Sequence, residues 1–120
     1  MPHMLLIHEP VGQRATRTEL EGRLLYERML RWGEDLRSRG LLLAAESLAS
    51  TDQAVRVTAA AGKVRIVDGP FAEAKEMVGG FFLVNVGTRE EAVALAQQCP
   101  AAEWATVEVR GLAPCFDREK

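Results

Sequence analysis

The run FFLVNV, residues 81–86, decides how this chain folds. Apolar side chains occupy both odd and even positions in it, and successive side chains of a strand point to opposite faces of a sheet. A strand of this composition is covered on both faces and therefore lies inside its sheet. The run MLLI, residues 4–7, has the same character. The two runs predict two central strands.

The rest of the chain supplies two helices and further strands around these runs. Each helix begins with a capping box, in which a threonine and a glutamate three residues later satisfy free amides of the first turn. Apolar residues recur at helical spacing in the first helix, whereas they alternate with polar residues in the hairpin and the last strand. The predicted elements are a helix between Thr18 and Gly40, a strand over 41–48, a hairpin over 53–68, a helix over 89–99 and an edge strand over 104–110.

The order of these elements predicts an α+β fold with a ferredoxin-like sheet, in which the hairpin is an insertion between two β-α-β units. Residues 1–120 then form a single domain, with a core over about 3–110 and a C-terminal tail over 111–120. Two helices cover only one face of such a sheet. The other face would expose phenylalanine and leucine side chains to water. We therefore predict a homodimer that packs sheet against sheet.

Composition and charge exclude several classes of protein. A net charge of −2 supplies no basic surface for a nucleic acid, so no direct nucleic-acid partner is expected. The apolar run at 4–7 is too short for a signal peptide or a membrane span, which predicts a cytoplasmic protein with no membrane partner. Cys99 and Cys115 lack the spacing of a redox motif, and the two cysteines and two histidines offer no metal-ligand spacing. We predict no metal and no cofactor.

Residues 67–84, VDGPFAEAKEMVGGFFLV, predict a shaped loop between the hairpin and the second central strand. Pro70 has no amide hydrogen and holds Gly69 extended, so the chain must turn there and direct Phe71 inward. Residues 72–78 favour one or two turns of helix, which the two glycines that follow Val78 would end.

The same loop gathers charged side chains that are candidates for contact with a ligand. In one interpretation Asp68 is a catalytic base or hydrogen-bond acceptor, a role that Glu76 can also fill. Lys75 then binds an anionic group of the ligand, and Phe71 forms part of the binding site. In the other interpretation the segment is a solvated surface turn, in which Asp68 caps its own loop amides.

Three further residues outside the loop are candidates for the site. His8 follows the first central strand, and an imidazole there is suited to acid-base catalysis near neutral pH, although a hydrogen-bonded histidine at a strand end is the alternative. Tyr26 flanks the apolar stripe of the first helix, and Glu46 interrupts an apolar strand near its end. We expect Tyr26 and Glu46 to contact the ligand. The predicted pocket lies between the sheet end, His8 and the loop.

Several of these segments together resemble the DGPF group of the YCII-related proteins. They are MLLI at 4–7, DGPFAEAKE at 68–76, GGFFLV at 79–84, a helix that ends in Cys-Pro, and VEVR at 107–110. The resemblance covers about residues 3–110. It implies a dimeric α+β barrel, largely bacterial, whose members are mostly uncharacterised.

The wider YCII group also implies a reaction. One branch of it resembles a lyase that removes chloride from a chlorinated hydroxyquinol, with a His and an Asp as the proposed working pair. The wider group carries that His within its first helix, where this chain reads Arg28-Met29-Leu30-Arg31. The histidine of that dyad therefore has no counterpart at this position.

Three hypotheses for the function follow. The first is the binding of a small organic ligand beside the DGPF loop, with a lyase-type reaction as its enzymatic form. The second is an accessory or regulatory role with an extracytoplasmic-function sigma factor, because relatives of the DGPF group resemble proteins encoded beside, or fused to, such factors. The third is a structural dimer without a pocket.

Overall fold

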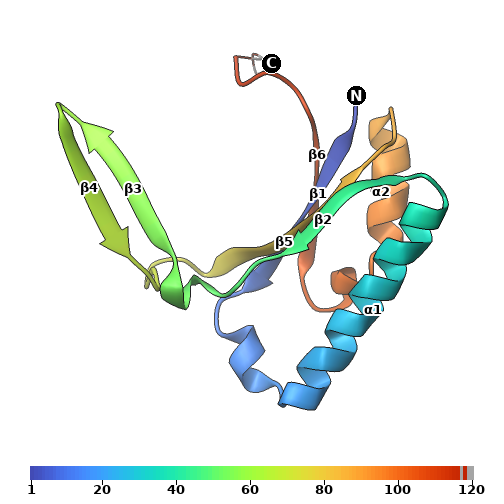
Figure 1. The fold of residues 1–120 in the computed structure, drawn as a ribbon, viewed down its shortest axis with the longest axis horizontal. Helices are drawn as coiled ribbons and strands as arrows, with labels where there is room; N and C mark the ends of the chain where they lie inside the picture. Colours follow the sequence, from blue (N-terminus) through green and yellow to red (C-terminus); the bar gives the residue numbers. More distant parts are fainter. Residues whose placement is uncertain (117, 119–120) are drawn as a thin grey trace.

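The computed structural model describes residues 1–116 and 118. A four-stranded antiparallel sheet forms its centre (Figure 1). The main elements, in chain order, are β1 (His3–Pro10), α1 (Glu19–Ser38), β2 (Leu42–Ser47), β5 (Glu76–Val84), α2 (Arg89–Gln98) and β6 (Thr106–Gly111). Strands β3 (Val55–Ala60) and β4 (Lys63–Asp68) form a separate hairpin, and three short helices lie in connecting segments: η1 (Gln13–Thr16), η2 (Thr51–Gln53) and η3 (Pro100–Glu103).

The order of strands in the sheet is β2-β5-β1-β6. The two strands predicted to be central, β1 and β5, are the central ones, and β6 lies at an edge as predicted. Leu5 is paired with Phe82 across the two central strands. The α+β fold is thus confirmed, and its topology is compatible with the ferredoxin-like arrangement predicted from the sequence.

Both helices begin at the predicted capping boxes. The Thr18 hydroxyl accepts a hydrogen bond from the Glu21 amide at 3.1 Å, and the Glu21 carboxylate accepts one from the Thr18 amide at 2.8 Å. Thr88 and Glu91 form the same reciprocal pair at the start of α2. Gly40 has a φ of 71°, the left-handed conformation that favours glycine after a helix. None of the described helices combines the length and the apolar character needed to cross a membrane.

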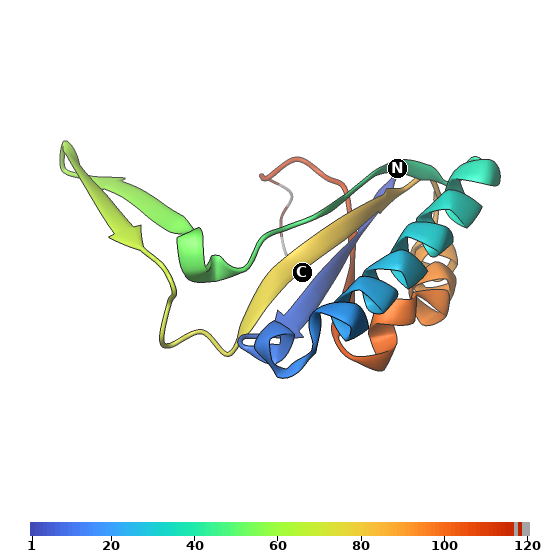
Figure 2. The ribbon, with the colours of Figure 1, turned by 60° about the horizontal axis from the view of Figure 1, so that its bottom comes forward.

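The core lies between the two helices and one face of the sheet, which Figure 2 shows from the side. Leu5 and Val84 of the central strands and Leu36 of α1 are fully buried in it. Burial of each such side chain stabilises the fold by about 1.5–3 kcal/mol. Trp32, on the apolar stripe of α1, packs its ring edge-on against Phe82 with the ring centroids 4.9 Å apart. The stripe therefore faces the sheet, as its spacing predicts.

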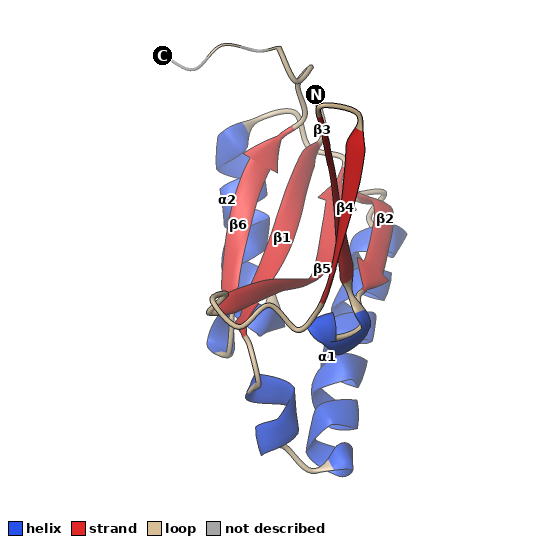
Figure 3. Ribbon diagram, turned by 90° about the vertical axis from the view of Figure 1, so that its left-hand side faces the viewer, coloured by secondary structure: helices blue, strands red, loops and turns tan. Residues whose placement is uncertain are grey.

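Both α1 and α2 lie on one side of the sheet, and neither covers the opposite side (Figures 2 and 3). On β1 the side chains alternate between buried and partly exposed, and Met4 and Leu6 belong to the partly exposed set. Leu83 is the β5 partner of Met4, and Phe81 is the partner of Leu6. We call the surface formed by these four apolar side chains and His8 the open face.

The helix predicted over 72–78 is absent. Residues 71–75 form turns, and β5 already begins at Glu76. The two glycines lie inside this strand because each meets a close neighbour there. A Cβ atom on Gly79 would overlap the Glu9 carboxylate, and one on Gly80 would lie 2.8 Å from the backbone oxygen of Glu46. Because these glycines have no Cβ atom, the Glu9 carboxylate and the Glu46 backbone can approach the strand closely. The glycines do not end a helix.

The two cysteines differ in environment, which predicts different reactivity. Burial raises the pKa of the Cys99 thiol to about 11, whereas Cys115 is exposed. Near pH 8 the thiolate fraction of Cys99 is then on the order of one in a thousand. We expect a thiol reagent such as Ellman's reagent to label one cysteine rapidly in the native protein and both in denaturant. The Cys115→Ser variant should show no rapid labelling, and rapid labelling of two thiols would contradict the burial of Cys99.

Candidate functional site

A cavity of about 420 Å³ lies between α1 and the helix-covered face of the sheet. Its lining includes Leu25, Tyr26, Met29 and Leu30 of α1, Ile7 and Phe82 of the central strands, Ala45 of β2, and Trp104 after η3. Tyr26 and Leu30 are about half exposed, so they form the part of the wall that meets solvent. The volume is within the range of ordinary small-molecule sites, roughly 300–1,000 Å³.

The sequence of α1 sets the position of this cavity. Apolar residues at Leu25 and Met29 face the sheet, whereas buried Gly33 stands one turn further along the helix. A Cβ atom on Gly33 would lie 3.4 Å from the ring of Phe82, so the helix backbone approaches the sheet closely at that point. Residues of α1 before Gly33 line the cavity with larger side chains.

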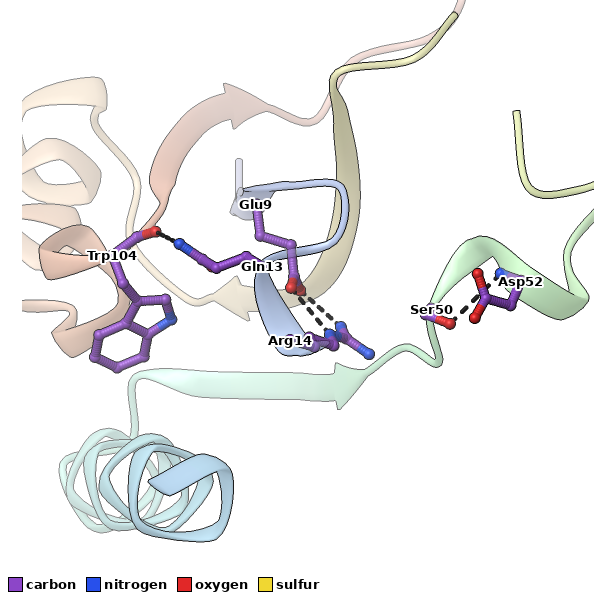
Figure 4. A network of polar contacts seen from close by, with 6 residues as sticks. All are labelled: Glu9, Gln13, Arg14, Ser50, Asp52 and Trp104. Atoms are coloured by element: carbon purple, nitrogen blue, oxygen red, sulfur yellow. Dashed lines mark hydrogen bonds and ion pairs between the residues drawn. The ribbon is translucent and has the colours of Figure 1, made fainter. Parts of the chain in front are cut away.

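An ion pair forms part of the polar lining of the cavity. Arg14 donates to Glu9 through two hydrogen bonds, from Nε to Oε2 at 2.9 Å and from Nη2 to Oε1 at 2.6 Å (Figure 4). The Glu9 side chain is 10% exposed and the Arg14 side chain is 36% exposed. The hydrogen bond to Glu9 raises the pKa of Arg14 above its ordinary value. Such a forked pair fixes both side chains in one geometry.

The loop after β1 is held at a second point beside this pair. The Gln13 side-chain amide donates a hydrogen bond to the backbone oxygen of Trp104 at 2.8 Å (Figure 4). Its Oε1 atom is buried and has no hydrogen-bond partner among the described residues. These contacts tie η1 to the segment after η3. The segment that carries Arg14 is therefore anchored from both sides.

Two more arginines line the cavity, and they differ in their partners. Arg37 is 3.4 Å from the carboxylate of Glu34, one turn before it on α1. Arg17 has no carboxylate within ion-pair distance among the residues that the structure describes. Arg17 as a residue is partly exposed. Arg17 thus offers a ligand carboxylate a guanidinium group without a described ion pair, although Glu21 lies close enough to interact with its charge.

The structure places some of the predicted site residues in this cavity and others elsewhere. Tyr26 lines it. Glu46 is also among its lining residues, but its pairing with Phe81 directs its side chain to the open face. His8 lies on the open face, on the other side of the sheet, where its Nε2 atom is 2.6 Å from Oε1 of Glu108. The hydrogen-bonded alternative for His8 is thus the observed geometry. Its role in catalysis stays a prediction.

The DGPF loop forms a separate, shallow hollow of about 480 Å³. Asp68, Phe71, Arg56 and Glu73 are among its lining residues, and Phe71 is the buried one. Phe71 turns inward as predicted, and the Arg56 guanidinium lies 3.6 Å from the centre of its ring. Arg56 is also 3.4 Å from the Glu73 carboxylate. We regard this hollow as the weaker candidate because exposed side chains form most of its lining.

Lys75 and Glu76 line neither of the two hollows. The Lys75 backbone oxygen accepts a hydrogen bond from the Val11 amide at 2.9 Å, and Glu76 is paired with Pro10. No described contact joins either residue, or Asp68, to His8. The predicted pocket between His8 and the loop is therefore not one of these two hollows, and the roles of these residues stay predictions.

Sequence reasoning missed the Glu9–Arg14 pair, although a signal for it exists. Glu9 has the same strand parity as Leu5 and Ile7, which face the core. A carboxylate on an apolar face needs a partner, because burial of an uncompensated charge is costly. Arg14, five positions later in a connecting loop, is a cation within reach. The clue in the sequence was that Glu9 occupies the next of the alternating strand positions that face the core, two residues after Ile7.

Known proteins resemble the chain over most of its length. The family model of the YCII-related domain matches residues 1–115. An uncharacterised protein of Rhizobium meliloti (strain 1021) is 37% identical over 76 residues, which are 62% of this chain and 61% of that relative. The chain thus spans less than two thirds of the length of that curated relative. On the match of the domain model, the chain belongs to the YCII-related domain family.

Proposed function

We propose that this protein binds a small organic anion, with a carboxylate head and an apolar body, in the cavity between α1 and the sheet. The observation that carries the proposal is the position of Arg17 on the lining of a cavity whose other walls include Leu25 and Met29. The apolar walls favour an aromatic or branched aliphatic body. The guanidinium group favours the carboxylate, which it can bind through two parallel hydrogen bonds.

Binding is better supported than catalysis by the groups at the site. Both oxygens of the Glu9 carboxylate accept hydrogen bonds from Arg14, so Glu9 is not a free base. Glu46 is among the lining residues, but it is paired with Phe81, so its side chain is directed to the open face and is not placed to act on a ligand in the cavity. A base that removes a proton must reach the reacting atom of a bound substrate.

The affinity for carboxylates should fall when Arg17 is neutralised. A hydrogen bond to a charged group contributes about 1.5–3 kcal/mol, and the lower value suits a partly exposed arginine. We therefore expect Arg17→Gln to weaken the binding of aromatic and aliphatic carboxylates about tenfold. The measurement is a thermal-shift screen followed by calorimetry, with the primary amides of the same acids as neutral probes. The amides should bind weakly, and with equal affinity, to the wild type and to the Arg17→Gln variant.

Arg23→Gln is the matched control for this experiment. Arg23 lies on the solvent side of the same helix, pairs with Glu19 and does not line the cavity. His8→Ala and Asp68→Ala test the pocket that the sequence predicts, and neither should change the affinity. The absence of any carboxylate binder, or equal losses in Arg17→Gln and Arg23→Gln, would contradict the proposal. Loss of binding in His8→Ala or Asp68→Ala would favour the pocket that the sequence predicts between His8 and the DGPF loop.

We also propose that two copies of the chain pack their sheets together through the open face. Met4, Leu6, Phe81 and Leu83 form an apolar surface that no described helix covers. A surface of this kind on a small protein is usually an interaction site. Burial against a second sheet would give the barrel-like dimer that the resemblance implies. No described feature favours a sigma factor as the partner, and that association stays a prediction.

A further inference from the structure

The β3–β4 hairpin has one apolar face that nothing in the described structure covers. Val57 is paired with Ile66 and Ala59 with Val64, so these side chains share a face of the hairpin, together with Val55. Val57, Val64 and Ile66 are each more than 60% exposed. Arg56, Thr58, Lys63 and Arg65 do not belong to this face because of the alternation along each strand.

A hairpin of this kind is not expected to keep its structure alone in water. Its strands pair only with each other, and all twelve of their residues are exposed. Isolated two-stranded hairpins are marginally stable at best, and an exposed apolar strand surface invites association. The described contacts anchor the hairpin at its base: the Gly69 amide donates a hydrogen bond to the Ala54 oxygen at 2.7 Å, and Arg56 stacks on Phe71 and pairs with Glu73. The apolar face therefore needs a partner.

The position of the hairpin indicates which partner fits. Figure 3 looks along the molecule from the hairpin side, with the sheet behind the hairpin and the helices behind the sheet. The hairpin and the open face thus stand on the same side of the molecule, apart from one another (Figures 1 and 2). A second copy that packs on the open face would enter the space beside the hairpin.

Position and symmetry favour a second copy as the occupant. The three cations of the hairpin, Arg56, Lys63 and Arg65, lie on the face opposite Val57 and Ile66. The face that would meet the partner is therefore the apolar one, and the basic face can stay in water. In a two-fold symmetric dimer each hairpin contacts the body of the other copy, so one pair of surfaces is used twice.

We propose that the β3–β4 hairpin is an arm that packs its apolar face on the body of a second copy of this chain. This inference rests on the proposed dimer through the open face. The hairpin is ordered by that contact, and its basic face, on the other side of the two strands, points away from the contact. Contacts that exclude water from Val57 and Ile66 hold the two subunits together in addition to the sheet-to-sheet interface.

Two neighbouring residues with opposite orientations test the arm. Val57 lies on the apolar face and Thr58 on the other, so Val57→Gln and Thr58→Gln introduce the same side chain on opposite sides of one strand. We expect Val57→Gln to raise the dissociation constant of the dimer at least tenfold in sedimentation velocity, and Thr58→Gln to change it less than threefold. Neither change should affect the fold of the body, because the hairpin strands pair only with each other.

Hydrogen exchange gives a second readout that does not depend on a variant. The amides of 55–68 should be protected at protein concentrations where the dimer forms and should exchange rapidly after dilution to the monomer. A dimer whose dissociation constant is equal in the two variants, with a hairpin that stays unprotected, would overturn the arm and leave the sheet-to-sheet dimer standing. A chain that is monomeric at all concentrations would overturn both.

Discussion

Glu9→Gln is expected to lower the free energy of unfolding by about 2–3 kcal/mol. The glutamine keeps the shape of the side chain, but it cannot accept both hydrogen bonds from Arg14 with a full negative charge. It therefore leaves a guanidinium group without its counter-charge beside the core. Removal of one partner of a fully buried pair costs about 3–5 kcal/mol. The loss expected here lies below that range because the Arg14 side chain is 36% exposed and solvent screens part of its charge.

Urea unfolding monitored by tryptophan fluorescence measures this loss. Glu19→Gln is the matched control, because Glu19 forms an ion pair with Arg23 in which both side chains are more than 70% exposed. That change should cost less than about 0.5 kcal/mol. Arg14→Met should be destabilising as well, and the double variant Glu9→Gln/Arg14→Met should lose less than the sum of the two single losses. Equal effects of Glu9→Gln and Glu19→Gln would show that the Glu9–Arg14 pair stabilises the fold no more than an exposed ion pair does.

The elements that the sequence predicts correctly depend on local signals. A capping box, such as the one from Thr18 to Glu21, uses residues three positions apart, and its reciprocal hydrogen bonds form within one turn. The central position of β1 and β5 follows from apolar side chains at consecutive positions, which need cover on two sides. These signals do not depend on which distant segment becomes the neighbour.

The errors arise where a distant neighbour decides the structure. Gly79 and Gly80 favour the end of a helix when only nearby residues are considered. In the folded chain they leave room for Glu9 and for the backbone of Glu46, which belong to β1 and β2. Tertiary contact of this kind overrides the local helix propensity of 72–78.

The candidate site was partly predictable, because the face on which a strand residue lies is a local signal, whereas its partner in space is not. The strand parity of His3 and His8 correctly assigns them to opposite faces: His3 is buried, with its Nδ1 atom 3.0 Å from the Val86 oxygen, and His8 lies on the open face. The partner of His8 is Glu108, one hundred positions away. No spacing rule relates residues at that separation, so the sequence supports His8 as a candidate and does not supply its partner.

The proposed binding site and the proposed dimer interface use opposite faces of one sheet. The cavity with Arg17 lies on the helix-covered face, whereas Leu83 and His8 lie on the open face. Neither Leu83 nor His8 lines the cavity, so a change at Leu83 leaves the cavity lining in place. This separation allows the two proposals to be tested independently, because a monomeric variant should still bind carboxylates.

Leu83→Glu is expected to convert the dimer to monomers and to raise its dissociation constant at least a thousandfold. Leu83 lies in the middle of the open face, on the central strand β5 and opposite Met4 of β1. A carboxylate at that position would be buried against the partner's apolar side chains without a counter-charge. Such burial costs several kcal/mol, and about 4 kcal/mol corresponds to the thousandfold change.

Sedimentation equilibrium over a range of concentrations measures this effect. Leu20→Glu is the matched control, since Leu20 lies on α1, on the other side of the sheet, and is 66% exposed. That variant should dimerise like the wild type. In the isolated subunit Leu83 is only partly buried, so the glutamate can reach water there and the monomer should stay folded by circular dichroism. A wild-type chain that is monomeric and folded at micromolar concentration would contradict the proposed dimer, because the open face would then have no need of a second copy. A Leu83→Glu variant that still dimerises would also contradict it, because the dimer would then use another surface.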